Sequence, residues 1–280
     1  MTPGIGFAIL ALLCFGASDL IYKRAAASGV GGREFAMLQA WTFCPGVTLY
    51  AWATGNLNVT LATLWGVFAG LFLLIAVINF VRSLQEGAVS TNAPIFRLNF
   101  AVTVALAVPL LGETLSVTKI AALAATLAAV WLLLAEPGPR RVDAKSLLRV
   151  VVASIAMGCG NFCYKVGVIN GATPETMISA QAWLFCPAAT LMFWETNPRM
   201  ALTPGAWRYA SGAAVILIIG MVGLLHGLKV GFASVLVPVA QMGFVVTALL
   251  GAALFREKLN LRKYTGLAVA VAALALFAVS

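Results

Sequence analysis

One arginine lies deep inside an apolar stretch of the chain, and its chemistry points most directly to a function. The stretch begins near Ala88, so at about 1.5 Å per residue a helix would place Arg97 about 14 Å along it, close to mid-bilayer. An ionisable group at such a depth is costly in lipid and usually functional. Because a guanidinium fork suits a carboxylate, we expect Arg97 to bind the carboxylate of a substrate. The alternative is that it bonds backbone carbonyls freed near Pro94.

Uncharged side chains supply the other candidates for substrate binding, which are Asn79, Gln241, Trp41 and Trp183. Gln241 follows Pro238 by three residues, as Arg97 follows Pro94. Asn79 either contacts a ligand or bridges two helices, a bond worth about 0.6 kcal/mol on average. The two tryptophans either face a substrate or anchor their helices at the membrane interface.

Residues near the ends of the apolar stretches are candidates for a gate or vestibule: Asp19, Tyr22, Lys23, Arg82, Tyr164 and His226. Asp19 precedes Lys23 by four residues, which is a favourable spacing for an ion pair on one helix. That pair is either a gate at the inner mouth or an ordinary solvated pair. His226 either lines an outer vestibule and titrates there or is only solvated.

Four prolines inside apolar stretches are candidate hinges: Pro45, Pro94, Pro187 and Pro238. A proline cannot donate to the carbonyl four residues earlier, so helices around Pro45 and Pro187 should bend near Trp41 and Trp183. These bends are either hinges or a simple curvature around neighbouring helices.

Other kinds of site find no support in the sequence. The five cysteines, all inside apolar stretches, are expected to pack as free thiols without a disulfide or metal: Cys14, Cys44, Cys159, Cys163 and Cys186. No phosphate-binding loop or Ser/His/Asp set is present, so we expect neither a cofactor nor an enzyme. No carboxylate is expected at mid-depth, which disfavours exchange of protons for cationic drugs and favours a gradient-driven facilitator.

The elements that must hold these residues are membrane helices. The 280 residues are 62% hydrophobic and 10% charged, which leaves too little polar surface for a water-soluble body. Mean hydropathy is +0.99. An all-α polytopic protein in a lipid bilayer follows, with ten spans near residues 3–22, 35–53, 60–81, 88–111, 116–135, 147–166, 175–194, 206–228, 232–254 and 261–280. The first span lacks preceding basic residues, so it should remain as a helix.

The chain contains the same pattern twice. Gln-Ala-Trp-x-Phe-Cys-Pro at 39–45 recurs at 181–187, and Tyr22-Lys23 recurs at the same spacing as Tyr164-Lys165. With two residues inserted, a later set recurs as well: Gly87, Ser90, Pro94, Glu113, Leu115 and Lys119 match Gly231, Ser234, Pro238, Glu257, Leu259 and Lys263. We therefore expect two five-helix repeats of one fold, 1–143 and 144–280.

Loop charges indicate how the chain sits in the membrane. The basic residues after odd-numbered spans are Lys23, Arg24, Arg33, Arg82, Arg140, Arg141, Lys145, Arg149, Arg199, Arg208, Arg256, Lys258, Arg262 and Lys263. Only Lys119, Lys165 and Lys229 follow even-numbered spans. Basic loops stay cytoplasmic, so both termini should face outward and the net charge of +9 reflects topology, not nucleic-acid binding. With five spans per repeat, the second repeat is inverted, a design of secondary transporters.

The repeated tail of each half resembles a known family. Gly231-Phe-Ala-Ser234, Pro238 and Phe255-Arg-Glu257-Lys-Leu259, with the counterparts in the first half, are similar to the end of an EamA-type repeat of the drug/metabolite transporter superfamily. Overall the chain is most similar to bacterial aromatic amino acid exporters. The resemblance implies that helices one, three, four, six, eight and nine surround a central cavity, with helices five and ten outside.

The sequence and the resemblance together predict a monomeric secondary transporter of the bacterial inner membrane. It would export aromatic and other neutral amino acids, such as methionine or threonine, and related small metabolites by alternating access. A carrier of sugar phosphates or nucleotide sugars, which would need several cationic side chains in its cavity, is one alternative. A drug exporter of the same superfamily is another, and a membrane-embedded lipid enzyme is an alternative of a different class.

Overall fold

A computed structural model describes residues 2–134, 143–255 and 260–280, and within these ranges it is built of helices without a strand. The α-helices are α1 (Ile5–Ala27), α2 (Gly32–Ala53), α3 (Leu64–Glu86), α4 (Val89–Arg97), α5 (Asn99–Leu111), α6 (Val117–Leu134), α7 (Ala144–Ile169), α8 (Pro174–Trp194), α9 (Ala206–Val230), α10 (Ala233–Gln241), α11 (Gly243–Phe255) and α12 (Leu261–Val279). A short 3₁₀ helix, Leu61–Thr63, precedes α3. Glu257, Arg140, Arg141, Arg256, Lys258 and Leu259 lie outside the described residues.

The helices have the length and the surface of membrane spans. Within the described residues, nine stretches are long and apolar enough to cross a bilayer, and α2, with 22 residues, is a tenth of sufficient length. Large apolar side chains cover the outer surface, as at Leu61 (84% exposed) and Val271 (61% exposed). Lipid is the solvent in which such a surface is stable. The chain is therefore an all-α, multi-pass membrane protein, as predicted.

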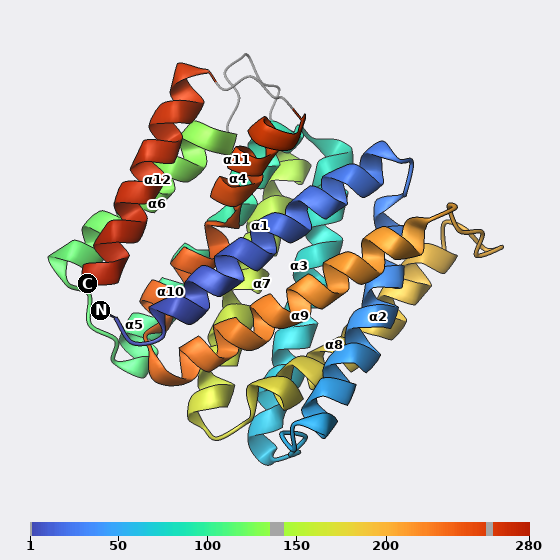
Figure 1. Ribbon diagram of the computed structural model, residues 1–280, viewed down its shortest axis with the longest axis horizontal. Helices are drawn as coiled ribbons and strands as arrows, with labels where there is room; N and C mark the ends of the chain where they lie inside the picture. Colours follow the sequence, from blue (N-terminus) through green and yellow to red (C-terminus); the bar gives the residue numbers. More distant parts are fainter. Residues whose placement is uncertain (1, 135–142, 256–259) are drawn as a thin grey trace.

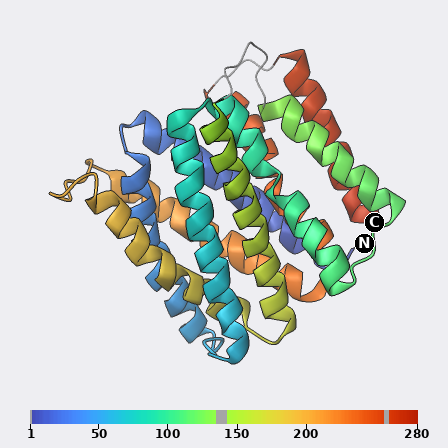
Figure 2. The same ribbon diagram turned by 180° about the vertical axis from the view of Figure 1, so that it is seen from behind.

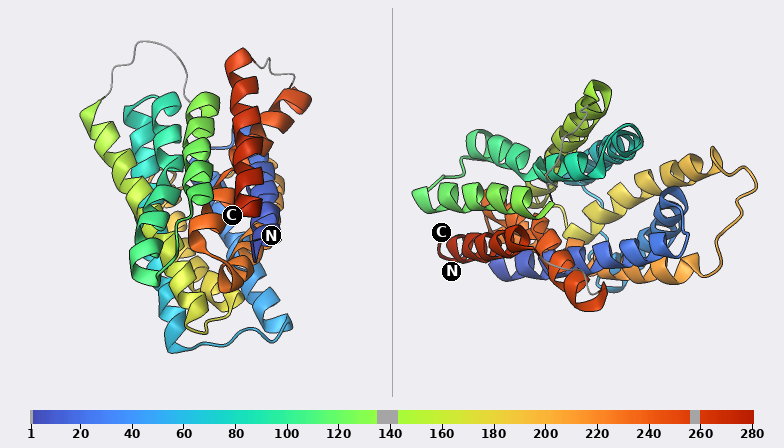
Figure 3. Two further views of the ribbon diagram at one scale, coloured as in Figure 1. Left: turned by 90° about the vertical axis from the view of Figure 1, so that its left-hand side faces the viewer. Right: turned by 90° about the horizontal axis from the view of Figure 1, so that it is seen from above.

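Helices from the two halves of the chain pack against each other in pairs. In Figure 1, α1 lies along α9, while α2 packs on α8 and α6 on α12. Figure 2 shows α3 beside α7 from behind. We call the end of the bundle that carries both chain termini the terminal end, and the opposite end the basic end. The helix α1 starts at the terminal end, whereas α7, which opens the second half, starts at the basic end (Figures 1 and 3).

Equivalent residues of the two halves make equivalent contacts. The Trp41 indole N–H donates to Thr190 Oγ1 and the Trp183 indole N–H to Thr48 Oγ1, both at 3.0 Å. A Cβ added to Gly16 would lie 2.5 Å from the Gly243 carbonyl oxygen, so glycine permits the close packing of α1 on α11. In the other half, Gly158 of α7 approaches α5 in the same way, where a Cβ would lie 2.6 Å from the Asn99 carbonyl oxygen.

Two of the predicted spans, 88–111 and 232–254, are broken in the middle and do not continue as single helices. The break between α4 and α5 is at Leu98, whose N–H donates to the Ile95 carbonyl at 3.0 Å. The break between α10 and α11 is at Met242, whose N–H donates to Val239 at 3.1 Å. These bonds reach back three residues in place of four, which tightens the turn. Each break follows a proline by four residues, Pro94 in α4 and Pro238 in α10.

Candidate functional site

A cavity of about 380 Å³ lies between the two halves of the bundle. Its walls come from α1, α2, α3 and α4 of the first half and from α7, α8, α9 and α10 of the second. The resemblance to EamA-type repeats had implied six surrounding helices. The structure adds α2 and α8 to them, because these two helices cross between the halves and close the cavity on one side. The helices α6 and α12 contribute no lining residue and pack together outside (Figure 3).

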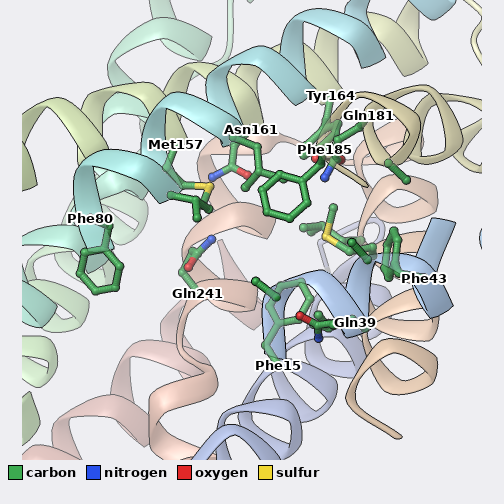
Figure 4. Close-up of a pocket in the computed structure, with 18 of the residues that line it drawn as sticks. Phe15, Gln39, Phe43, Phe80, Met157, Asn161, Tyr164, Gln181, Phe185 and Gln241 are labelled. Atoms are coloured by element: carbon green, nitrogen blue, oxygen red, sulfur yellow. Dashed lines mark hydrogen bonds between the residues drawn. The ribbon is translucent and has the colours of Figure 1, made fainter. Parts of the chain in front are cut away.

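Aromatic and other apolar side chains form most of the cavity wall. The aromatic ones are Phe15, Phe43, Phe80, Phe96 and Phe185, together with the rings of Tyr22 and Tyr164. Figure 4 shows Phe15 and Phe43 on one side of the cavity and Phe185 on another. Phe80 and Phe96 stack with their ring centroids 4.2 Å apart. Such a wall offers large apolar surfaces to a flat or aliphatic ligand.

Six polar side chains interrupt this apolar wall: Tyr22, Gln39, Asn161, Tyr164, Gln181 and Gln241. Gln39 Nε2 donates to Tyr22 Oη at 2.8 Å, and the equivalent Tyr164 hydroxyl donates to Gln181 Oε1. Amide and hydroxyl groups both donate and accept hydrogen bonds. Among the residues that the structure describes, none with a charged side chain lines the cavity. The site can therefore orient a polar group without imposing a net charge on its ligand.

Arg97 ends α4 and forms an ion pair with Asp19 of α1, with 2.8 Å between Arg97 Nη2 and Asp19 Oδ2. Thr247 Oγ1 is 3.3 Å from the same carboxylate oxygen. In this conformation the guanidinium is engaged by a carboxylate and does not line the cavity, and an acidic side chain lies at the depth of Arg97, where none was expected. Spacing along one helix pointed only to Lys23 as a partner of Asp19, and could not reveal a partner on another helix.

The second half has uncharged side chains at the two equivalent positions. Gln241 ends α10 as Arg97 ends α4, and Asn161 of α7 is the repeat equivalent of Asp19. Both amides line the cavity, and Figure 4 shows them facing it from opposite walls. Asn161 Nδ2 also donates to Asn99 Oδ1 at 3.2 Å. Gln241 was among the residues proposed from the sequence, whereas Asn161 was not. The signal that could have identified Asn161 is its equivalence to Asp19 in the repeat.

Several other candidates lie away from the cavity. Asn79 Nδ2 donates to the Ile75 carbonyl of its own helix at 2.9 Å. Trp41 and Trp183 are about half exposed on the outer surface, where their indole N–H groups join α2 to α8. Lys23 and Arg82 are exposed toward the basic end. Of the residues proposed for gates, only Tyr22 and Tyr164 line the cavity.

His226 has an acidic partner, Glu175, on another helix. Its Nε2 lies 2.9 Å from Glu175 Oε1, which joins α9 to the first turn of α8 at the terminal end. The Glu175 side chain is 2% exposed, and its other carboxylate oxygen is buried without a hydrogen-bond partner. The ring of Phe7 stacks on His226 with centroids 6.1 Å apart. The pair therefore ties two helices together at one end of the cavity.

The four candidate hinge prolines divide into two kinds. Pro45 and Pro187 lie inside α2 and α8, which run through them as continuous helices. Pro94 and Pro238 lie inside the short helices α4 and α10, just before the two breaks. The breaks lie at equivalent positions of the two halves. Arg97 and Gln241 therefore also lie at equivalent positions, each as the last residue of its short helix. That these four prolines act as hinges stays a prediction.

Comparison with known proteins gives a match to a family model and a likeness to solved structures. Residues 2–135, nearly all of the first predicted repeat, match the model of the EamA-like transporter family. A solved structure described only as "Crystal structure of protein" has a TM-score of 0.83 at 15% identity, over 98% of this chain and 95% of that chain. At that identity the likeness shows the fold alone. No curated protein sequence matches the chain.

Proposed function

We propose that the chain is a secondary transporter of the EamA type that exports neutral amino acids and related small metabolites. Aromatic amino acids, methionine and threonine are the proposed substrates. The observation that carries the proposal is the cavity between the halves, which is aromatic, contains amide groups and lacks a charged lining residue among those described. A volume of about 380 Å³ is near the lower limit for ligand pockets, roughly 300–1,000 Å³, and suits a small metabolite.

The polar groups of the cavity suit a zwitterion. An amino acid presents an ammonium donor and a carboxylate acceptor, and amides and hydroxyls can satisfy both. We assign these contacts to Gln241 and Asn161 and to the two Tyr–Gln pairs, which lie on opposite halves. The phenyl rings of Phe43 and Phe185 would pack against the substrate side chain. Arg97 is engaged by Asp19, so in this proposal it supports the helix break and does not bind the substrate.

The alternatives require charges that the described lining lacks. A sugar-phosphate or nucleotide-sugar carrier would bind phosphate with arginine or lysine forks. An exporter of cationic drugs would need an acid in the cavity, and Asp19 is already neutralised by Arg97. None of the described lining residues is a carboxylate or a histidine that could carry a proton, so we propose a gradient-driven facilitator.

The mechanism that we propose is alternating access between two inverted repeats, 1–143 and 144–280. The pairing of α1 with α9 and of α3 with α7, with equivalent contacts in both, supports such an exchange of conformations. The loop charges support a bacterial inner membrane location in which the terminal end is periplasmic and the basic end cytoplasmic. A single chain forms the whole cavity, which supports a monomer as the functional unit.

Uptake into proteoliposomes tests the proposal. The purified chain would be reconstituted and offered labelled neutral amino acids, sugar phosphates and a cationic dye, with and without a pH gradient. We expect uptake of the neutral amino acids that follows their own gradient and is insensitive to the pH gradient. Uptake of phosphorylated solutes with no amino acid signal above empty vesicles would replace the proposal by a sugar-phosphate carrier.

A further inference from the structure

The two halves make equivalent contacts, but their equivalent ends differ in burial. Residues 163–168, at the terminal end of α7, are all buried. Their repeat equivalents in α1, residues 21–26, lie at the basic end, and among these only Ala25 is buried. The first residues of α8 are likewise buried more completely than those of α2. The terminal end of the bundle is therefore packed shut, whereas the basic end is more open.

A buried lysine holds the terminal end closed. Lys165 Nζ donates to the carbonyl oxygens of Leu228 and Gly231, at 2.7 Å each, and the residue is 8% exposed. These carbonyls belong to the last turn and the cap of α9, where a helix leaves acceptors without partners. A cation there also meets the negative end of the helix dipole. Lys165 therefore fastens α7 to α9 and gives hydrogen-bond donors to helix-end carbonyls that would otherwise lack them. We call these two lysine–carbonyl bonds the lysine clamp.

The first half contains the same three residues in equivalent places. Lys23 corresponds to Lys165, and Leu84 and Gly87 correspond to Leu228 and Gly231. Gly87 caps α3 as Gly231 caps α9. The packing differs, because α7 contacts α9, whereas α1 and α3 show no comparable packing in the described part of the chain. The first half thus has, at the basic end, the lysine and the two carbonyl groups that a second lysine clamp requires.

We infer that Lys165 and Lys23 are alternate gate residues that clamp opposite ends of the cavity in turn. In the conformation described, Lys165 closes the terminal end. In the opposite conformation, Lys165 leaves α9, and Lys23 donates to the carbonyls of Leu84 and Gly87 at the end of α3. The inference rests on the proposed alternating access, and it specifies which contacts break and which form between the two conformations.

The clamps are not equally strong, which accounts for the end that is closed here. The terminal end has the Glu175–His226 pair beside the lysine clamp. The repeat equivalents of these residues are Arg33 and Arg82, two cations that cannot attract each other. Closure of the basic end therefore depends more heavily on Lys23. Without a substrate, the conformation closed at the terminal end is the favoured one.

Thiol labelling measures which end is open and needs no transported solute. In a background without the five native cysteines, single cysteines would replace Ala36, which lines the cavity, and its repeat equivalent Ile178, which is 0% exposed. A membrane-impermeant reagent is then applied from one side at a time. We expect Ala36→Cys to react from the basic end and Ile178→Cys to be protected from the terminal end.

Removal of Lys165 should change the two labelling rates in opposite directions, and removal of Lys23 should not. Lys165→Met should raise the rate at Ile178→Cys about tenfold and lower that at Ala36→Cys, as expected when the population of the other state grows. Lys23→Met should leave Ile178→Cys protected. The matched control is Lys229→Met, which removes an exposed lysine from the last turn of α9 at the same end. It should change neither rate.

Three outcomes would overturn the inference. They are faster labelling at both positions in Lys165→Met, no change at Ile178→Cys, or the same response to Lys23→Met as to Lys165→Met. If Lys165→Met does not accumulate in the membrane, Lys165→Gln keeps a shorter, uncharged donor group and should give a smaller shift in the same direction. A chain that fails to carry neutral amino acids yet shows the opposed labelling would refute the proposed substrate and keep the gate.

Discussion

The ion pair between Arg97 and Asp19 should be replaceable by the uncharged residues that occupy the equivalent positions of the second half. Arg97→Gln together with Asp19→Asn copies Gln241 and Asn161 into the first half. Each single change would leave the other charge without its partner inside the bundle. We therefore expect either single variant to be markedly less stable than the double variant, which restores a neutral pair.

The structure sets the size of this effect. With 2.8 Å between the bonded atoms, the charge centres lie about 4 Å apart, where attraction is about 4 kcal/mol at an effective dielectric constant near 20. Breaking a fully buried pair costs about 3–5 kcal/mol. The side chains are 22% and 25% exposed, so solvent screening reduces the loss to about 2–3 kcal/mol for each single variant. The double variant should stay within about 1 kcal/mol of the parent.

A double-mutant cycle on the purified protein in detergent measures this coupling. Unfolding would be followed by tryptophan fluorescence for the parent, both single variants and the double variant. Lys145→Gln is the control, because its pair with Glu86 spans 3.5 Å and the lysine side chain is 67% exposed, so its loss should cost less than about 1 kcal/mol. If the double variant loses the sum of the two single losses, the residues are not coupled and the reasoning is wrong.

Three further predictions concern single residues. Gln181→Leu removes a polar group of the cavity and the acceptor of the buried Tyr164 hydroxyl, so it should raise the KM for a neutral amino acid and cost about 1–3 kcal/mol of stability; an unchanged KM would remove Gln181 from the site. Trp183→Phe loses the bond to Thr48 and should cost about 1 kcal/mol of stability while substrate preference stays the same, so altered preference in a competition assay would contradict its place outside the cavity. His226→Ala leaves the Glu175 carboxylate buried without its partner and should cost about 1–3 kcal/mol, whereas a variant as stable as the parent in melting experiments would show that the pair contributes nothing.

Much of the fold followed from the sequence because lipid imposes simple rules. Long apolar stretches must be helices, since backbone groups in a bilayer need internal partners. The repeated motifs also indicated one fold for both halves, and equivalent residues do make equivalent bonds, Tyr22 with Gln39 and Tyr164 with Gln181. The two helix breaks were not foreseen, although Pro94 and Pro238 marked them, because proline often only bends a membrane helix.

The candidate site was predicted less well, because its geometry depends on which helices become neighbours. The depth of Arg97 was visible in the sequence, but its partner Asp19 lies on another helix. Likewise, Glu175 and His226 are far apart in the chain, and only the packing of α8 on α9 brings them together. Asn161 could have been proposed as a site residue from the sequence alone, because the repeat makes it equivalent to Asp19. Side chains on one helix follow from spacing, whereas pairs between helices follow from packing.

The central claim is that an uncharged cavity between inverted halves carries solutes without net charge. The most direct test compares uptake of three solutes of similar shape into proteoliposomes: phenylalanine, its cationic amide and the anionic phenylpyruvate. We predict that the zwitterion is carried and that the cation and the anion stay near the level of empty vesicles. Uptake of either charged analogue at a rate similar to that of phenylalanine would contradict the claim.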